Sequence, residues 1–599
     1  MPPERARKTW LPPVGSPGYH ILLVAVALLV LGPLGGVTAA YMNFSLGFFV
    51  GGQVLAGILG SAVTYGYGVE GKQGANYMQT LAASVATLSG MCVVVQAMVW
   101  LGMPQPSAWK LVAFFICVGM FGVGVGMLYT PLLVDRLQLE YPSGHAVANI
   151  LRALTDPRLL RRSIGKLGGG TLAGGGLAAL ADHVAFVGAT RISGSTIGAG
   201  MVIGSRNTVS AALYGAVGVA LVPTLRAHGW LGPHDPFRKI GFLGALAMIL
   251  GAAVVDLTLV GVDATRRIRA RGGVAVLQVD TRGKSLSTRS LLVWCAVWAV
   301  ALVMVTHLLL GQPVGWVVLA IALSVVFVCI NGISNGITDS NPISSAFVIS
   351  VLLMSALGLK NPVAGLISSS VLLLSCAIGV DMQQDRSTGW RLGTNRLNQF
   401  RYQVLGVGMG AILCVVFARL FMRAYPVLAV DSFTHPEART GEWQSAMTFK
   451  LVGSIRDLGH LPAYKAVALA IGFALGFGIE IARKLLFRSA GYRAAVARGR
   501  GGALLGWFVE ALLLPSPYAS SFGGFVDLPT SLWFGAGGLI SDGINLTKGP
   551  VAKAVVVAGA EAEALPEDMS TASLVGGGLI AGESLFALGV GLFGLLHLL

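Results

Sequence analysis

Two acidic residues are candidates for chemistry because they lie within apolar stretches of the chain. Asp339 belongs to the segment 331–342, which reads NGISNGITDSNP, and Glu583 is the only Asp, Glu, Lys or Arg between positions 571 and 599. A carboxyl group in an apolar environment is costly and usually functional, and burial favours its protonated form. Asp339 and Glu583 are therefore predicted to bind and release a proton. The alternative is a carboxyl that reaches the surface or pairs with Lys or Arg.

Four polar segments interrupt the apolar background, namely 141–149 (YPSGHAVAN), 331–342, 383–389 (QQDRSTG) and 514–518 (LPSPY). Non-helical backbone at membrane depth persists only where it is buried in protein or lines a wet cavity. Segment 331–342 is predicted to line a cavity, with a surface loop as the alternative. Segment 383–389 lies beside several Arg and is predicted to be a cytoplasmic loop. The predicted solute-binding residues of the first two segments are Tyr141, Ser143, His145, Asn149, Asn331, Asn335, Thr338 and Asn341. A purely structural role is the alternative for His145.

The composition identifies the elements that must position these residues. Of 599 residues, 54% are hydrophobic and 11% are charged, whereas soluble domains carry roughly 25% charged residues. The chain is therefore predicted to be an all-α polytopic membrane protein, which excludes a soluble enzyme and a disordered scaffold. The net charge of +16 comes from Lys and Arg clustered between apolar runs. That pattern is typical of cytoplasmic loops and not of nucleic-acid binding.

Sixteen apolar segments approach the length of about 20 residues that a membrane helix needs. They are 20–42, 45–68, 74–102, 109–134, 165–190, 207–225, 239–262, 289–311, 314–333, 342–359, 361–381, 402–422, 462–484, 503–514, 529–546 and 571–599. Several are short, so 14 to 16 crossings are predicted. Segments 141–156 and 193–206 are predicted to be broken or re-entrant helices. The apolar run from Ile21 is predicted to be a retained first helix and not a cleaved signal peptide.

The basic stretch near 263–288 divides the chain into two similar halves, as in repeat-built transporters. The predicted organisation is a cytoplasmic tail (1–18), a first transmembrane half (19–262), a basic cytoplasmic linker (263–288) and a second transmembrane half (289–599).

Two motifs typical of soluble enzymes occur by chance. Residues 332–336 match G-x-S-x-G, and residues 589–594 match the dinucleotide fingerprint, but neither has the required strand–turn–helix context. No phosphate-binding loop or H-E-x-x-H zinc motif is present. No catalytic residue, metal ligand or cofactor is predicted, and an ion gradient or a separate subunit would supply energy.

The ordered motifs resemble the oligopeptide transporter (OPT) superfamily, especially its prokaryotic and yellow-stripe-like branches. The segments that carry the resemblance are 141–146, 197–204 with Gly215 and Pro223, 384–389 with Gln403 and Gly406, 514–519, and 578–583. Two positions depart from the family pattern: Ser387 stands where Lys is common, and Tyr518 where Met is common.

The resemblance implies a proton-coupled secondary transporter of about 16 helices, working by alternating access and formed by duplication. Its substrates would be small peptides or metal–chelate complexes, and Gln403 and Tyr518 join the predicted binding residues. The expected partners are this substrate, protons and membrane lipids, without nucleic acid, and a homo-oligomer is left open. The expected location is a plasma (inner) membrane, bacterial in origin. A membrane-embedded hydrolase using Ser334 and a passive channel are the alternatives.

Overall fold

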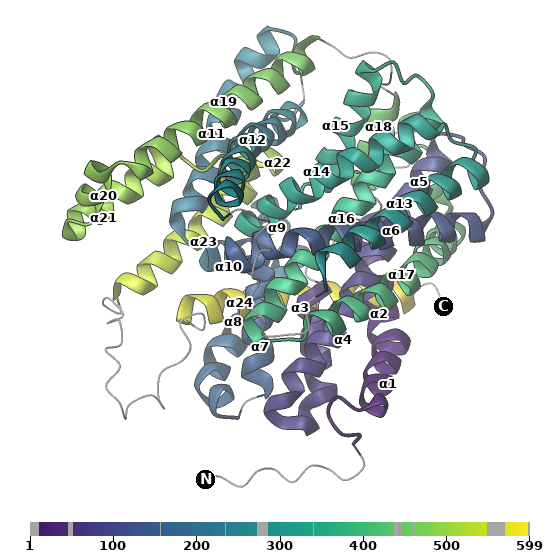
Figure 1. Cartoon of the computed structure of the whole chain (residues 1–599), viewed down its shortest axis with the longest axis horizontal. Coiled ribbons are helices and arrows are strands. Elements are labelled where there is room, and N and C mark those ends of the chain that lie inside the picture. The colour runs from purple at the N-terminus through teal and green to yellow at the C-terminus, as the bar shows by residue number, and fades with distance from the viewer. Residues whose placement is uncertain are drawn as a thin grey trace.

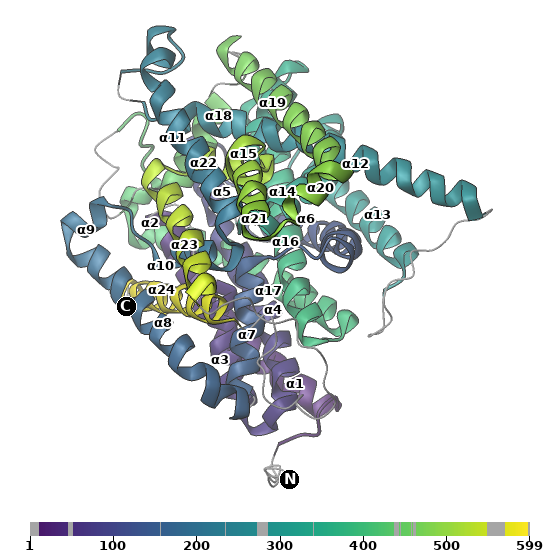
Figure 2. The same cartoon turned by 90° about the vertical axis from the view of Figure 1, so that its left-hand side faces the viewer.

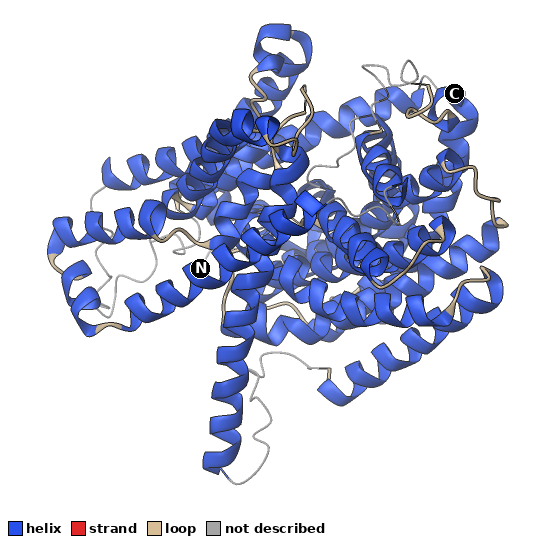
Figure 3. Cartoon of the chain, turned by 90° about the horizontal axis from the view of Figure 1, so that it is seen from above, coloured by secondary structure: helices blue, strands red, loops and turns tan. Residues whose placement is uncertain are grey.

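The structure is a computed structural model of the whole chain. It describes residues 11–45, 52–155, 157–233, 235–271, 286–339, 341–435, 443, 445–456, 458, 463–547 and 570–596. Every regular element in these ranges is a helix, and none is a strand (Figure 3). This agrees with the predicted all-α class, because in lipid a helix satisfies its own backbone hydrogen bonds.

The helices in the first part of the chain are α1 (Pro17–Val26), α2 (Gly32–Ser45), α3 (Gly52–Thr64), α4 (Gly71–Ser89), α5 (Val93–Trp100), α6 (Ala108–Thr130), α7 (Pro142–Thr155), α8 (Pro157–His183), α9 (Ala185–Ala189), α10 (Gly194–Ile203), α11 (Ser205–Ala227) and α12 (Arg238–Arg271). Of these helices, α1, α3, α4, α7 and α8 lie low in Figure 1, whereas α11 and α12 lie near its top beside α19 (Ala463–Arg488).

The later helices interleave with the earlier ones instead of forming a separate body (Figure 1). They are α13 (Thr288–Met304), α14 (Val314–Thr338), α15 (Ile343–Ala356), α16 (Pro362–Leu392), α17 (Arg396–Ala424), α18 (Ala446–Arg456), α19 (Ala463–Arg488), α20 (Ala490–Val496), α21 (Gly499–Phe508), α22 (Pro517–Phe525), α23 (Leu528–Thr547) and α24 (Thr571–Leu596). Short 3-10 and π-helical turns extend several of them, such as η2 (Tyr65–Glu70) and η4 (Pro131–Arg136).

Ten helical stretches in the described ranges are long and apolar enough to cross a membrane. They are Pro17–Phe44, Ala56–Trp100, Ala108–Arg136, Ser205–Ala227, Arg238–Val255, Thr288–Leu309, Val314–Ile337, Pro362–Leu392, Arg396–Ala424 and Ala463–Arg488. Three shorter apolar helices accompany them. Ten is fewer than the predicted 14 to 16, partly because the predicted spans 45–68 and 74–102 both overlap the single stretch Ala56–Trp100. The higher count and the two related halves stay predictions.

The two segments predicted to be broken differ from each other. Residues 142–155 form the single short helix α7, whereas residues 193–206 are interrupted at Gly204, which has a φ of 85° and separates α10 from α11. Only glycine adopts such a backbone conformation without strain. A re-entrant path for either segment stays a prediction.

Helix α16 occupies the interior of the bundle and is surrounded by α4, α6, α7, α14, α15 and α17 (Figures 1 and 2). Asn361 caps its start by accepting hydrogen bonds from the N–H groups of Val363 and Ala364, and Gly393, with a φ of 68°, ends it. The predicted cytoplasmic loop 383–389 is wrong, because these residues continue α16 inside the protein. Their polar side chains are accommodated by hydrogen bonds from the helices around them.

Close approach of α8 to α24 depends on glycine. A Cβ atom at Gly174 would lie 2.2 Å from the carbonyl oxygen of Leu579, and one at Gly582 would lie 2.0 Å from that of Thr171. Small residues let membrane helices pack backbone to backbone. This contact fixes the part of α24 that carries Glu583.

Candidate functional site

Asp339 lies at the break between α14 and α15, in a left-handed backbone conformation with a φ of 59°. Its N–H donates to the carbonyl oxygen of Asn335 at 3.0 Å. Its carboxylate lies at the first turn of α7, where the backbone N–H of Ser143 donates to Oδ1 at 2.9 Å and the Ser143 hydroxyl donates to Oδ2. A helix N-terminus stabilises negative charge through its free N–H groups and its dipole. The α14–α15 break therefore holds this carboxylate against the start of α7.

Gln384 of α16 completes this network. Its Nε2 donates to Asp339 Oδ1 at 3.2 Å, and its Oε1 accepts from Asn335 Nδ2 at 3.3 Å. One turn further along α16, the Thr388 hydroxyl donates to the carbonyl oxygen of Gly144 at 3.0 Å. We call Asp339, Ser143, Gln384 and Asn335 the Asp339 network. It joins α7, α14 and α16, and so brings together three of the four polar segments found in the sequence.

Two of the predicted asparagines stabilise the break itself. Asn331 Nδ2 donates to Asn341 Oδ1 at 3.0 Å, and Asn341 Nδ2 donates to the carbonyl oxygen of Cys376 in α16 at 3.2 Å. Asn331 is fully buried beside the Asp339 network. The side chain of Thr338, also a predicted binding residue, lies outside the described residues.

Tyr141 borders the Asp339 network through its backbone. Its N–H donates to the carbonyl oxygen of Gly336 at 2.9 Å, and its ring is fully buried. It anchors the start of α7 to the end of α14.

His145 lies at the edge of the site and contacts a different carboxylate. Its Nδ1 is 3.2 Å from Oε2 of Glu140, and Arg391 Nη2 lies 3.4 Å from the same oxygen. The hydrogen bond from His145, with the charge of Arg391 nearby, holds the pKa of Glu140 below its usual value. This contact supports the structural alternative for His145.

Asn149 points from α7 towards α24. Its Nδ2 donates to the hydroxyl of Ser573 at 2.9 Å. It therefore connects α7 to the helix that carries Glu583.

Glu583 is bound at the start of α10. The Ser193 hydroxyl, which caps this helix, lies 3.0 and 2.9 Å from the two carboxylate oxygens, and the N–H of Ser195 donates to Oε2 at 2.7 Å. Glu583 and Asp339, the two predicted proton-binding residues, belong to separate hydrogen-bond networks.

Gln403 of α17 and Tyr518 of α22 are both buried. Gln403 Nε2 donates from α17 to the carbonyl oxygen of Ile378 at 3.5 Å, and Tyr518 of α22 packs in the main hydrophobic core.

A second polar cluster, which was not predicted, lies on an adjacent face of α16. Asp381 and Asp385 lie one turn apart there, and the side chains of Gln79 and Ser84 of α4 reach them. The i,i+4 spacing of the two acids was the available signal. It was missed because Arg386 and Arg391 suggested a loop.

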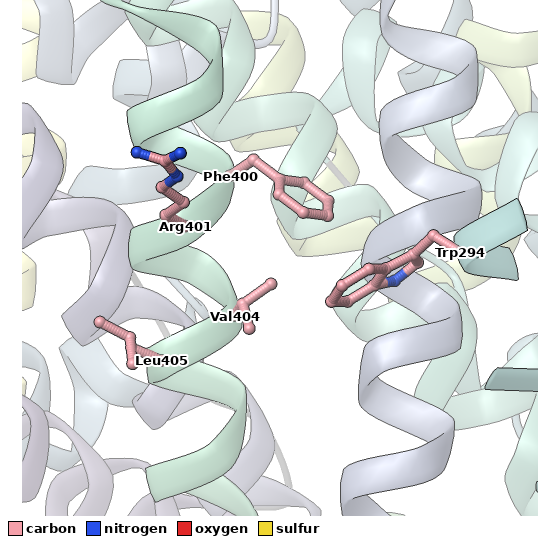
Figure 4. A pocket seen from close by; sticks show the side chains of 5 residues that line it. All are labelled: Trp294, Phe400, Arg401, Val404 and Leu405. Atoms are coloured by element: carbon pink, nitrogen blue, oxygen red, sulfur yellow. The ribbon is translucent and has the colours of Figure 1, made fainter. Parts of the chain in front are cut away.

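A depression of about 300 Å³ lies between α13 and α17. Figure 4 shows its lining, with the ring of Trp294 facing Phe400 and Val404 and with Arg401 on the opposite side of α17. The lining is apolar apart from Arg401, and it contains none of the predicted binding residues. We assign it no part in the site.

The described residues contain no group of three or more His, Cys, Asp or Glu side chains that could hold a metal ion. The side-chain oxygen and nitrogen atoms of the Asp339 network belong mainly to amide and hydroxyl groups. This composition favours hydrogen bonding to a polar solute.

Comparison with known proteins identifies the family. The OPT oligopeptide transporter protein family matches residues 21–187 and 278–593. A curated relative, the probable metal-nicotianamine transporter YSL8 of Oryza sativa subsp. japonica, is 28% identical over 144 residues, which are 24% of this chain and 21% of the relative. The chain therefore matches about a fifth of that relative's length.

The matched residues include most of the segments that suggested this family. Segments 141–146, 384–389, 514–519 and 578–583 fall within them, whereas 197–204 does not. Members of this family are transporters and not enzymes, so the hydrolase alternative at Ser334 is set aside. Since more than half of its length matches, the chain belongs to the OPT oligopeptide transporter family.

Proposed function

We propose that this protein is a proton-coupled secondary transporter of small peptides or of metal complexes with amino-acid-derived chelators. The observation that carries the proposal is the Asp339 network, in which a carboxylate at a helix break joins α7, α14 and α16. Membership of a transporter family and the name of the rice relative support the substrate class. In a metal complex the chelator supplies the ligands, so the protein needs no metal site of its own.

The polar side chains around the break would replace the hydration of the solute. Asn335 and Gln384 already hydrogen-bond each other, so a solute with amide or carboxylate groups can exchange with that contact. Asp339, Ser143 and Gln384 are each partly exposed, which gives a solute access. The proposed solute site therefore lies between α7, α14 and α16.

Proton binding at Asp339 would loosen this site. The ionised carboxylate accepts charge-assisted hydrogen bonds from Ser143 and Gln384, which are stronger than neutral ones. Protonation removes the charge and weakens both contacts between helices. In the proposed mechanism this exchange favours one orientation of an alternating-access cycle over the other. Glu583, held at the start of α10, is the second candidate for the same role.

The chain is a multi-pass membrane protein, and we place it in the plasma membrane of a bacterium with its basic loops in the cytoplasm. Lipids surround the bundle in this proposal. Assembly into a homo-oligomer is compatible with it.

Uptake into proteoliposomes with an inward proton gradient tests the function. The solutes are a labelled mixture of small peptides and a ferric complex of an amino-acid-derived chelator. We expect accumulation that a protonophore abolishes. Flux without accumulation would instead indicate the passive channel. No uptake of either solute by folded protein would overturn the proposed substrate classes.

A further inference from the structure

Three helices contribute a pair of polar residues one turn apart to a second buried cluster. The pairs are Asp381 and Asp385 on α16, Thr80 and Ser84 on α4, and Gln399 and Gln403 on α17. Each of these side chains is fully buried except Asp381, which is 7% exposed. We call this set, together with Gln79, the acid-pair cluster.

Hydrogen bonds tie the acid-pair cluster together. Gln79 Nε2 donates to Asp385 Oδ1 at 2.6 Å, and the Ser84 hydroxyl lies 3.4 Å from Asp381 Oδ2. Gln399 Nε2 donates to the backbone carbonyl of Asp385 at 2.6 Å and to the Thr80 hydroxyl at 3.1 Å. Both carboxyls therefore face α4, and Gln399 of α17 connects α4 to α16 beside them.

Several acceptors of the cluster have no donor. Asp385 Oδ2, Gln79 Oε1 and Gln403 Oε1 are buried and make no hydrogen bond within the structure. A buried acceptor without a partner is costly. The Asp385 carboxyl thus presents an oxygen that a bound proton or cation would satisfy.

One arginine brings positive charge to the acid-pair cluster. Arg386 of α16 approaches the cluster, and its Nη1 donates to Gln399 Oε1 at 3.3 Å and to the carbonyl oxygen of Thr394 at 3.1 Å. Arg396 of α17 pairs instead with Asp135 at 2.7 Å. Tyr77 of α4 is the other titratable side chain in electrostatic range of Arg386. Arg386 thus contacts the cluster through Gln399, one of its members.

We propose that Asp381 and Asp385 share a single bound proton and form a coupling-ion site distinct from Asp339 and Glu583. Two neighbouring carboxylates in a low-dielectric interior cannot both ionise without compensation, and they titrate as a pair. One proton, with Arg386, brings the cluster to neutrality. The coupling role rests on the proposed function, whereas the shared proton does not.

The acid-pair cluster and the Asp339 network lie on one helix. Gln384, which binds Asp339, stands immediately before Asp385 in α16 and points to a different neighbour. A rotation or shift of α16 when the proton leaves would therefore be felt at the proposed solute site. Rigid elements shared by two sites are the physical means of such coupling.

Infrared difference spectroscopy of the full-length protein in detergent tests the shared proton without any substrate. The measured signal is the carbonyl band of protonated carboxyl groups, lost in a step from about pH 6 to about pH 9, because exposed carboxyls stay ionised throughout that step. Asp381→Asn and Asp385→Asn should each reduce this signal by the same amount. The double variant should reduce it no further. Asp182→Asn, which changes a side chain that is 60% exposed, is the matched control and should leave it unchanged.

Arg386→Gln gives an independent test should either Asn variant fail to fold. Removing the positive charge disfavours ionisation of the pair, so the midpoint of this signal should move to higher pH. A signal unchanged in both Asn variants would overturn the proposal, as would reductions that add in the double variant. Displacement of the wild-type signal by sodium in place of potassium would overturn the assignment to a proton. Because no uptake is measured, a wrong substrate class does not affect the result.

Discussion

Asp339 and Glu583 are held by the same kind of clamp on two different backbones. In each case a serine hydroxyl and a backbone N–H at a helix N-terminus bind the carboxylate, at α7 for Asp339 and at α10 for Glu583. Asp339, however, stands at a break between two helices, whereas Glu583 lies within the continuous helix α24. The same chemistry therefore has different surroundings: one carboxylate joins α7 to a break between two helices, and the other joins α10 to a helix packed through glycines.

Removing the charge of Asp339 and removing the charge of Glu583 should therefore have different effects. Asp339→Asn should reduce proton-driven accumulation by at least about tenfold, which corresponds to roughly 1.4 kcal/mol of lost driving interaction. Exchange of solute across proteoliposomes without a gradient should continue, because the helices stay folded. Glu583→Gln should reduce the yield of folded protein more than the accumulation per folded molecule.

Both activities are measured on the same preparations, normalised to monodisperse protein. Asp182→Asn is the control for loss of a carboxylate at an exposed position. Equal loss of accumulation in the Asp339 and Glu583 variants would remove the distinction between the two acids. Loss confined to Glu583→Gln would reverse it.

The position of Glu583 depends on the contact between α8 and α24. Gly582→Ala places a Cβ atom 2.0 Å from the carbonyl oxygen of Thr171, so the two backbones must separate. We expect a loss of about 1–3 kcal/mol in stability, typical of overpacking, and a lower melting temperature in detergent.

Gly589→Ala on the same helix is the matched control, since a Cβ atom there meets nothing within 4 Å. It should leave the melting temperature unchanged or raise it, because Ala favours helix over Gly. If both variants melt alike, the glycine contact does not hold α24.

Much of the Asp339 network could be predicted from the sequence, because the signals for it are local. Pro, Gly, Asn and Asp in an apolar background mark 141–149 and 331–342, and hydrogen bonds of Ser143 and Tyr141 do join these segments. Gln384, which α16 contributes to this network, was not predicted. Flanking arginines made a surface loop the favoured reading, and only the packing of α16 shows that the residues there are buried.

The acid pair could not be recognised for a related reason. A buried Asp is plausible only when its partners are known, and Gln79, which binds the carboxylate of Asp385, lies 306 residues away in the sequence. Glu583 was found because no other charge lies near it, although its partners at α10 were not foreseen. An isolated charge can be recognised from the sequence alone, whereas the side chains of other helices that stabilise a charge cannot.

Ser143 and Ser193 allow a more direct comparison of the two carboxylate sites, with a smaller expected effect. Ser143→Ala and Ser193→Ala each remove a hydroxyl donor to a carboxylate, which costs roughly 1.5–3 kcal/mol for a bond to a charged group. Both should lower the melting temperature at neutral pH. Only Ser143→Ala should also alter proton-driven uptake, because only its clamp spans the break.

Ser454→Ala is the control for these two variants, since its hydroxyl donates only to the carbonyl oxygen of Lys450 on its own helix. It should be close to neutral in both measurements. A change in uptake for Ser193→Ala as large as that for Ser143→Ala would contradict the assignment of Asp339 as the coupling carboxylate.

The smallest expected effect concerns the outer edge of the Asp339 network, where Glu140 bonds His145 and lies near Arg391. The pKa of Glu140 is lower in the folded protein than its ordinary value. The unfolded chain therefore takes up this proton first as the pH falls, so the stabilisation is fully present above the ordinary pKa of about 4.3 and is lost as the pH falls through the folded value. Because the Glu140 side chain is 53% exposed, solvent screens the effect.

Glu140→Gln should thus melt slightly below the wild type at neutral pH, and the difference should vanish in acid. Melting temperatures of both proteins across that range measure it. A difference that is constant with pH would show that Glu140 acts through packing and not through charge. A difference that grows in acid would mean that the folded protein disfavours the ionised form, and the start of α7 would then be held by its contacts to α14 and α16 alone.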